Sequence, residues 1–365
     1  MKKNVCHIAL RHPLFDTRVF FKEALPLSQA GYHITIVAKK SEGTAPVGIE
    51  AISCDSFFTG LRLLLSKKFD AYHVHDQTSL LLGIILCSIK RTPLIYDIHE
   101  HYFLFPRLRR GWKKRILNLV YAYIIEPLGI QLADLCIGVT PTMQRVYGKK
   151  SKRFLYFPNY YVGEMSATMP VENREAPFKN RFVLLYQGGM KRERGIYQYI
   201  DIVDALRKSF PNILLAYIGP FDGAEDKELF MQTIEKKQLQ DSVWYGGALP
   251  FQDVGKYTAQ ADVGLNFLAN SLNNNLGIQN KLFEYLAHGL PIFSSDNVEF
   301  VRDILVPQGL AVIAPYDNVA ISVTRLSEML AQKESYVQSV IQYRAGYQQQ
   351  QYIPSLIAAY KEIVG

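Results

Sequence analysis

The residues best suited to bind a ligand or take part in a reaction lie in the stretch 266–296, which reads NFLANSLNNNLGIQNKLFEYLAHGLPIFSSD. A polar, Asn-rich loop leads into a segment that we expect to be a helix beginning near Asn280 and ending at Gly289, because Asn caps helix starts and Gly follows helix ends. Backbone N–H groups at a helix start bind anions. Glu284, a turn inside, could hold the hydroxyls of a ribose. The pattern predicts a nucleotide site, and the alternative is a capped surface helix with Glu284 in solvent.

A second candidate site is the loop 188–195, GGMKRERG, which follows the expected strand Phe182–Gln187. Its glycines allow the backbone to approach a ligand closely. Lys191, Arg192 and Arg194 stand just before an expected helix, where positive charge is locally unfavourable. The loop therefore favours an anionic ligand, and the alternative is an exposed loop whose charges are solvated.

Histidines gather at the ends of two expected strands, in HVHD (His73–Asp76) and DIHEHY (Asp97–Tyr102). Two histidines one residue apart face the same side of a strand, an arrangement that suits a metal. A metallohydrolase needs further ligands at later strand ends, whereas only His288 follows His101, inside an expected helix. The favoured interpretations are a single histidine, His99, that hydrogen-bonds a polar ligand in a cleft, or histidines with a structural role.

The segment Arg107–Arg115, RLRRGWKKR, carries six cations and Trp112 in nine residues, and the apolar stretch Ile116–Ile125 follows it. This pattern is typical of a helix that lies on an anionic membrane surface. The alternative is a solvated basic face above a helix of the core. The surrounding half of the chain is basic as well. Residues 1–170 hold 23 Lys/Arg and 12 Asp/Glu, a net charge of +11, whereas the net charge of the whole chain is +8. No zinc-finger spacing or RNA-binding signature supports binding of nucleic acid.

The composition is that of a folded globular protein, with 365 residues of which 48% are hydrophobic and 20% charged. This length suits two domains. Four cysteines without a CxxC pair predict buried, reduced thiols in a cytoplasmic protein rather than disulfides or a zinc site. The first apolar run is too short for a signal peptide, and no apolar stretch is long enough to span a bilayer.

Short β-branched runs alternate with helical patterns along the chain, which predicts an α/β fold of parallel sheets covered by helices on both faces. The expected strands are Val5–Leu10, Ile34–Ala38, Ala71–Val74, Leu94–Asp97, Leu135–Gly138, Phe154–Phe157, Phe182–Gln187, Ile213–Ile218, Val243–Tyr245, Val263–Phe267 and Pro291–Phe293. A polar stretch at 163–180 divides the chain into domains 1–170 and 171–350, and residues 351–365 form a last helix. Two doubly wound domains would hold a ligand in a cleft between them.

Five segments resemble the retaining glycosyltransferases of family 4, which have the GT-B fold. They are FDTRVFFKEALPLSQAGYHITIVAKK (Phe15–Lys40), LIYDIHEHY, ADLCIGVTPTM with FPNYY, YQGGMKRERGI and QNKLFEYLAHGLPIFSSD. The last is the most specific, and together they extend over nearly the whole chain. The resemblance implies two Rossmann-like domains facing across a cleft, an acceptor bound by the first and a nucleotide sugar bound by the second. The last helix would cross back to the first domain.

The resemblance also implies roles for individual residues. His99 matches a histidine that contacts the donor sugar, Arg194 a basic residue that stabilises the departing diphosphate, and Glu284 the carboxylate that holds the ribose. No metal or other cofactor is then required, since cations and helix N-termini stabilise the diphosphate. The expected donor-binding residues are Gly188, Gly189, Lys191, Gly246, Leu249, Leu276, Gly277, Ile278, Gln279, Asn280 and Lys281. The expected acceptor-side residues are Arg11, Asp16, Arg18 and Glu100.

The chain departs from the family pattern at three places. The family's phosphate loop carries an Arg-x4-Lys pair, and here Gly189 and Arg194 occupy these positions. Leu276 stands where the family has an upstream Glu, so backbone N–H groups of Leu276–Gln279 are expected to contact the donor sugar. The first loop, Arg11–Arg18, lacks the common Gly-Gly pair.

The resulting prediction is a retaining, metal-independent hexosyltransferase. It would move a sugar from a nucleoside diphosphate sugar, with uridine as the base by family frequency, to a carbohydrate or lipid-linked acceptor in cell-surface polysaccharide biosynthesis. We expect a cytoplasmic protein, peripheral on the inner face of the membrane through Arg107–Arg115. Two alternatives stay open: a sugar-nucleotide epimerase of the same fold, and a degenerate, non-catalytic binding protein, which the departures from the pattern motivate.

Overall fold

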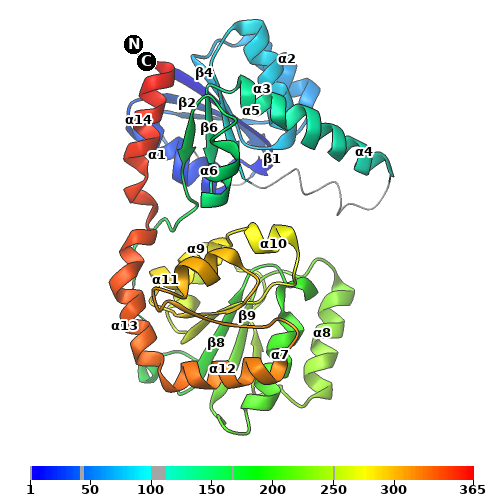
Figure 1. Cartoon of the computed structure of the whole chain (residues 1–365), viewed down its shortest axis with the longest axis vertical. Helices are drawn as coiled ribbons and strands as arrows, with labels where there is room; N and C mark the ends of the chain where they lie inside the picture. The colour runs from blue at the N-terminus through cyan, green and yellow to red at the C-terminus, as the bar shows by residue number, and fades with distance from the viewer. Residues whose placement is uncertain (1, 42–44, 100–111, 167, 250) are drawn as a thin grey trace. The chain divides into compact units, whose positions relative to one another are not determined.

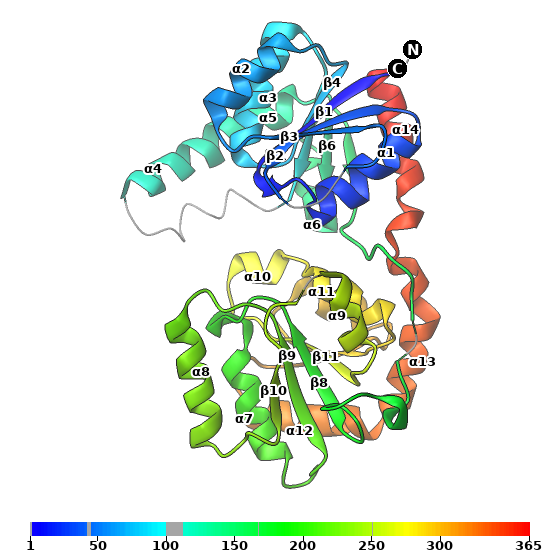
Figure 2. The same cartoon turned by 180° about the vertical axis from the view of Figure 1, so that it is seen from behind.

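The computed structural model describes residues 2–41, 45–99, 112–166, 168–249 and 251–365. The chain forms two compact units (Figures 1 and 2). Unit 1 comprises Met1–Val162 together with Gln349–Gly365, and unit 2 comprises Gly163–Gln348. The two ends of the chain therefore belong to the same unit.

Within the described part of the chain, unit 1 is built on a seven-stranded parallel sheet with the order β3-β2-β1-β4-β5-β6-β7. The strands are β1 (Asn4–Pro13), β2 (His33–Lys39), β3 (Ile49–Ser53), β4 (Ala71–Val74), β5 (Leu94–Ile98), β6 (Leu135–Gly138) and β7 (Phe154–Tyr156). Strands β4, β5 and β6 are buried along their whole length, because a parallel sheet is covered on both faces.

Two hydrophobic clusters of unit 1 lie on opposite faces of this sheet, as the alternation of side chains in β1 shows. The first cluster joins the sheet to α2 (Phe57–Ser66), α3 (Gln77–Lys90), α5 (Glu126–Leu132) and α6 (Pro141–Tyr147). The second joins it to η1 (Thr17–Ala24), α1 (Leu25–Gln29) and the C-terminal α14 (Ile353–Val364). The remaining helices are α4 (Trp112–Val120), η3 (Tyr121–Ile125) and η8 (Gln349–Gln351).

The described residues of unit 2 form a six-stranded parallel sheet with the order β10-β9-β8-β11-β12-β13. The strands are β8 (Phe182–Gln187), β9 (Ile213–Ile218), β10 (Val243–Tyr245), β11 (Val263–Asn266), β12 (Ile292–Ser295) and β13 (Ala311–Ala314). The helices are α7 (Ile196–Leu206), α8 (Ala224–Lys236), α9 (Phe251–Thr258), α10 (Leu272–Leu276), α11 (Asn280–Ala287), α12 (Val319–Ala331) and α13 (Lys333–Tyr343), with the short η4 (Val171–Asn173), η5 (Arg192–Arg194), η6 (Val301–Leu305) and η7 (Arg344–Tyr347).

Helices cover both faces of this second sheet as well. Helices α7, α8 and α12 share one hydrophobic cluster with the strands. Helix α11 packs on β11, where Gly264 makes room for it: a Cβ on Gly264 would lie 2.2 Å from the ring of Tyr285. Tyr285 is fully buried, and its hydroxyl donates towards the carbonyl of Leu185 (3.1 Å). This close approach fixes α11 against the end of β8.

The predicted class, two Rossmann-like doubly wound α/β sheets, is confirmed. The edge strands β3 and β13 were not expected. Strand β3, IEAIS, lacks a continuous apolar run, and β13, AVIA, is only four residues long. Asn280 is not the N-cap of α11, which is a correction: the cap is Gln279, and Asn280 is the first helical residue. The helix ends before Gly289, whose φ of +82° suits the expected stop.

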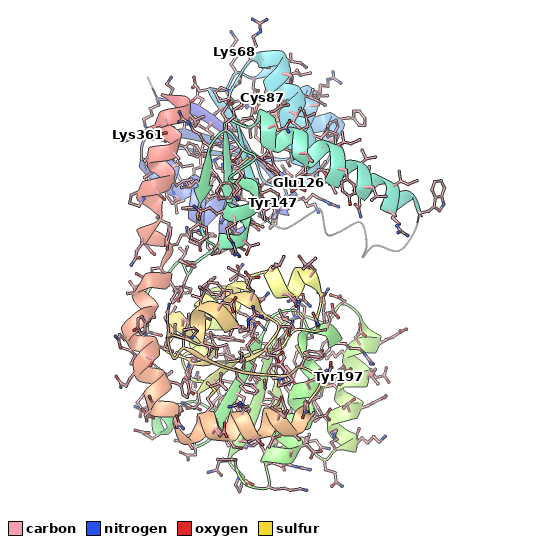
Figure 3. All side chains as sticks on the ribbon, in the orientation of Figure 1. Lys68, Cys87, Glu126, Tyr147, Tyr197 and Lys361 are labelled. Atoms are coloured by element: carbon pink, nitrogen blue, oxygen red, sulfur yellow. The ribbon has the colours of Figure 1, made fainter. Side chains whose placement is uncertain are left out.

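The four cysteines carry no disulfide, and Cys6, Cys54 and Cys136 are buried. Cys87, on α3 and labelled in Figure 3, is half-buried. Among the described residues, no helix has the length and apolar character needed to cross a membrane.

Candidate functional site

In unit 2, the glycine loop after β8 is packed against the loops that follow β9 and β10. The N–H of Gly188 donates to the carbonyl of Ile218 (2.9 Å), and the N–H of Gly219 donates to the carbonyl of Gly247 (2.8 Å). Gly219 has a φ of +150°, and a Cβ there would lie 1.9 Å from the carbonyl oxygen of Gly188. Only glycine fits this contact. Gly188 and Gly246, both expected donor-binding residues, therefore lie on either side of the end of β9, at the carboxyl ends of the strands, where open α/β sheets bind ligands.

Two cations of the glycine loop already have partners. The ammonium of Lys191 lies 2.8 Å from a carboxylate oxygen of Asp222. The guanidinium of Arg192 lies 5.0 Å from the ring centre of Tyr197, the α7 residue labelled in Figure 3. A cavity of about 180 Å³ is lined by these four side chains among others.

Arg194 lies over the glycines instead. Its Nη1 atom is 3.5 Å from the Cβ position of Gly188 and 3.8 Å from that of Gly189. The hydroxyl of Tyr186 donates to the carbonyl of Gly189 (2.8 Å), and burial raises the pKa of Tyr186 to about 12 against the opposing charge of Arg194. Arg194 thus stands next to backbone that a ligand could approach, as its predicted role requires.

Glu284 faces the end of β8 rather than solvent. Its Oε2 accepts a short hydrogen bond from Nε2 of Gln187. Thr258 donates from its hydroxyl to Oε1 of Gln187 (3.0 Å), and the backbone N–H of Gln187 donates to the hydroxyl of Tyr285 (3.1 Å). These bonds orient the carboxylate, so the alternative of a solvated surface glutamate does not describe Glu284.

Lys281, on the same helix, is 9% exposed, and its ammonium lies 4.0 Å from the ring centre of Tyr186. Within the described residues, no hydrogen-bond partner contacts this ammonium. Burial, aided by the positive charge of Arg194, lowers the pKa of Lys281 well below its usual range. A buried cation of this kind is costly unless something pairs with it.

The loop before α11 is partly committed to its own hydrogen bonds. The N–H of Gly277 donates to the carbonyl of Asn273 (2.9 Å) at the end of α10, and its contact with the donor sugar stays a prediction. The side chain of Gln279 accepts from Asn266 (3.2 Å) and donates to the carbonyl of Gly277 (3.0 Å). Asn280 is exposed. The other expected donor residues are half-buried: Gly246, Leu249, Leu276 and Ile278.

In unit 1, Asp97 at the end of β5 anchors His99. Nε2 of His99 donates to Oδ2 of Asp97 (2.5 Å), and Arg18 donates to both Asp97 oxygens through Nε and Nη2 (2.7 Å each). Burial works to raise the pKa of Asp97, but Arg18 and His99 outweigh it and hold this pKa well below its usual range. The side chain of His99 is 14% exposed, so one edge of a fixed imidazole is open to a ligand.

A chain of hydrogen bonds continues from Asp97 through three buried histidines. Nδ1 of His75 donates to Asp97 (3.3 Å), Nδ1 of His7 donates to Nε2 of His75 (3.0 Å), and the hydroxyl of Tyr360 joins Nε2 of His7 (3.4 Å) to Nδ1 of His73 (2.6 Å). Burial lowers the pKa of His75 to about 4 and those of His7 and His73 well below their usual range. Three neutral imidazoles, each donating once, satisfy this chain.

Glu23 brings a second carboxyl group to the same cluster. It is fully buried, and Nη2 of Arg18 lies 3.2 Å from its Oε1. Burial, together with the negative charge of Asp97, raises the pKa of Glu23 well above its usual range. The cluster therefore favours the ionised form of Asp97 and disfavours the ionised form of Glu23.

The histidine cluster also has a spacing that a metal could fit, since one atom from each of His7, Glu23, His73 and His75 lies within 4.8 Å of the others. The guanidinium of Arg18 beside Glu23 disfavours a second cation at this point. The imidazoles are already bonded to one another, to Tyr360 and to Asp97. These contacts favour a structural hydrogen-bonded network.

The expected acceptor-side residues differ in their burial and in their contacts. Arg18 is 4% exposed and committed to Asp97, which corrects the expectation that it contacts an acceptor. Oδ1 of Asp16 accepts from the N–H groups of Arg18 (2.9 Å) and Val19 (3.1 Å), so Asp16 caps η1. Arg11 is exposed. Glu100, and residues 107–111 of the basic segment, lie outside the described residues.

Comparisons with known proteins agree with this architecture. Residues 171–344 match the family Glycosyl transferases group 1. An uncharacterized glycosyltransferase of Methanocaldococcus jannaschii is 26% identical over 210 residues, which cover 55% of this chain and 48% of that protein. The match thus spans about half the length of that relative.

Two solved structures resemble the whole chain. HepE of Anabaena in complex with UDP-glucose has a TM-score of 0.73 at 14% identity, over 99% of this chain and 100% of that one. WaaG, a glycosyltransferase involved in lipopolysaccharide biosynthesis, has a TM-score of 0.69 at 15% identity, over 99% and 100%. Residues 171–344 thus match the glycosyl transferases of group 1, and the chain has the GT-B fold.

Proposed function

We propose that this protein is a retaining glycosyltransferase that moves a sugar from a uridine diphosphate sugar to a carbohydrate or lipid-linked acceptor, in the synthesis of cell-surface glycans. The observation that carries the proposal is the cluster of Glu284, Gln187, Arg194 and Lys281 at the strand ends of unit 2, inside the stretch that matches the family. It offers an oriented carboxylate for the ribose and cations for the diphosphate. The UDP-glucose complex of HepE and the lipopolysaccharide role of WaaG support the choice of donor and pathway.

In the proposed reaction, the bond between the anomeric carbon and the phosphate oxygen breaks, and its electron pair stays on the diphosphate. The acceptor oxygen forms the new bond on the same face of the sugar, and its proton passes to the leaving phosphate. No side-chain base and no metal is then needed. Arg194 stabilises the charge that develops on the diphosphate, and His99, held by Asp97, contacts the donor sugar.

A thermal-shift screen tests the donor. We expect UDP at 100 times its Kd to stabilise the protein by about 2.7 kcal/mol, a shift of several degrees, while GDP at the same concentration gives a smaller one. The first observation to make is the melting temperature with UDP, GDP and no nucleotide. If neither nucleotide shifts it, the proposed donor site is wrong.

Turnover of the donor separates the enzyme from its rivals. Purified protein incubated with UDP-sugar and EDTA should release UDP when an acceptor is present. Isomerised nucleotide sugar without an acceptor would instead identify an epimerase. Nucleotide binding with no turnover towards any acceptor would favour a non-catalytic binding protein.

We also propose that the protein is cytoplasmic and binds the inner face of an anionic membrane through α4 and η3. Apolar side chains on this stretch are exposed, with Trp112 at 70%, Leu117 at 69% and Tyr123 at 67%. A row of exposed apolar side chains beside basic residues is what an interfacial helix presents to a lipid surface.

Sedimentation with vesicles tests the membrane proposal. We expect the protein to pellet with phosphatidylglycerol vesicles at low salt, and the double variant Trp112→Ser/Leu117→Ser to bind them at least about tenfold more weakly, because two apolar side chains no longer enter the lipid. Leu229→Ser, which changes an exposed leucine on α8 (40%), is the matched control. Equal binding by the double variant would show that this face does not contact the membrane.

A further inference from the structure

The buried ammonium of Lys281 stands out because nothing in the described part of the chain pairs with it. Lys281 is 9% exposed, and its ammonium lies over the face of the Tyr186 ring, 4.0 Å from the ring centre. An aromatic face attracts a cation but offers no hydrogen-bond acceptor. The three N–H donors of this ammonium are therefore left for a ligand.

The charges around Lys281 point to the kind of ligand. Arg194 lies close enough to lower the pKa of Lys281, and this effect of Arg194 exceeds the opposing effect of Glu284. Two neighbouring cations with one carboxylate leave the site with excess positive charge, which a polyanion would neutralise. The ring of Tyr186 carries Lys281 on its face while its hydroxyl bonds to Gly189 in the glycine loop, so the ring links the ammonium to that loop.

The other lysine of the site is engaged elsewhere. Lys191 lies 2.8 Å from the carboxylate of Asp222 and is half-exposed. An exposed ion pair of this kind contributes little to stability, and its lysine is already engaged by a carboxylate. In the glycine loop, Gly189 stands where the resembled family has a second cationic residue. The loop therefore offers the diphosphate one guanidinium next to its glycines, that of Arg194.

We propose that Lys281 binds the diphosphate of the donor nucleotide together with Arg194, and so supplies from α11 the cation that the glycine loop lacks. This rests on the proposed function, since it assumes a nucleoside diphosphate in unit 2. The first turn of α11 adds backbone N–H groups beside the same ammonium. The second positive charge of the site thus comes from Lys281 on α11 rather than from the glycine loop.

Affinity for UDP tests the proposal. We expect Lys281→Met, which keeps the length and apolar stem of the side chain, to weaken UDP binding about 10- to 100-fold in calorimetry, as for the loss of hydrogen bonds to a charged group. Lys236→Met, which changes an exposed lysine at the end of α8, is the matched control and should leave UDP affinity unchanged. Wild-type affinity in Lys281→Met, or an equal loss in Lys236→Met, would overturn the proposal.

The melting temperature of the free protein distinguishes binding from a structural role. Removing a buried, unpartnered charge should leave the melting temperature of free Lys281→Met equal to or above that of the wild type. A clearly lower melting temperature together with lost binding would mean that Lys281 is structural, against the proposal. If the wild type binds no nucleoside diphosphate, the proposed function fails as well; if it binds UDP and Lys281→Met binds equally, only the role of Lys281 fails.

Discussion

Replacing Asp97 by Asn is expected to lower the free energy of unfolding of unit 1 by about 3–5 kcal/mol. The substitution keeps the shape of the side chain but removes the charge that Arg18 contacts through two bonds of 2.7 Å, in a place where both side chains are buried. The buried guanidinium of Arg18 would keep Glu23 beside it, but burial opposes the ionisation of Glu23. Hydrogen exchange in peptides from β1 and β5 measures the loss, and peptides from β8 and β11 of unit 2 serve as the internal control.

Glu23→Gln is the matched variant in the same cluster, and its expected effect is different. Glu23 is fully buried, and burial and Asp97 raise its pKa, so the cluster favours the neutral acid, which Gln resembles in shape and charge. We expect the variant to stay within about 1 kcal/mol of the wild type at pH 7. In the double variant the loss should exceed the sum of the single losses, because Glu23 can no longer ionise to replace Asp97. Equal losses in Asp97→Asn and Glu23→Gln would contradict this division of charge.

The two carboxyl groups also make opposite contributions to the pH dependence of stability. The folded pKa of Asp97 is depressed, so its contribution is present above its unfolded pKa of about 3.9 and is lost as the pH falls through the folded value. The folded pKa of Glu23 is raised, so its contribution is full below about pH 4.3 and is lost as the pH rises through the folded value. Glu23→Gln should therefore gain stability relative to the wild type as the pH rises from about 4.3 through the folded pKa of Glu23.

The second large effect is expected at Glu284. Glu284→Ala should raise the KM for the donor and lower turnover, with a fall in kcat/KM of about 100-fold or more, because two hydrogen bonds from ribose hydroxyls to a carboxylate are lost. The change also leaves Nε2 of Gln187 without the oxygen to which it donates. Steady-state kinetics with a varied UDP-sugar concentration measures both parameters.

Two comparisons sharpen the Glu284 experiment. Glu284→Gln keeps an acceptor oxygen and loses only the charge, so we expect a smaller fall of about tenfold. Glu225→Ala removes an exposed carboxylate from the first turn of α8 and should leave kcat/KM unchanged. Full activity in Glu284→Ala would show that the ribose is held elsewhere.

The fold was predictable because its central strands are continuous apolar runs that helices separate. Strand β9, ILLAYI, is buried at every position, and its predicted bounds coincide with those observed. Strand β3, IEAIS, was missed because it lies at an edge of the sheet and buries only its first residue. A short edge strand has no sequence pattern that distinguishes it from a loop.

Residues of the candidate sites could be predicted only where they stand within a local sequence motif. Glu284 and Arg194 stand in motifs that a helix start or a glycine loop makes visible. The contact of Arg18 with Asp97 joins residues 79 positions apart and leaves no local trace. Gln187 ends an otherwise apolar strand, and this lone polar residue was the available signal, because buried polar groups need partners.

The placement of α14 has a consequence for how the chain is made. Tyr360, on this last helix, hydrogen-bonds to His7 and His73 in unit 1. It lies 287 positions after His73 in the sequence. Between the two parts of unit 1 the ribosome must translate all of Gly163–Gln348. At about 5–20 residues per second this takes on the order of 10 seconds or more. During that time most of unit 2 is made and can begin to fold, while the histidine cluster of the nascent first unit still lacks Tyr360 and α14.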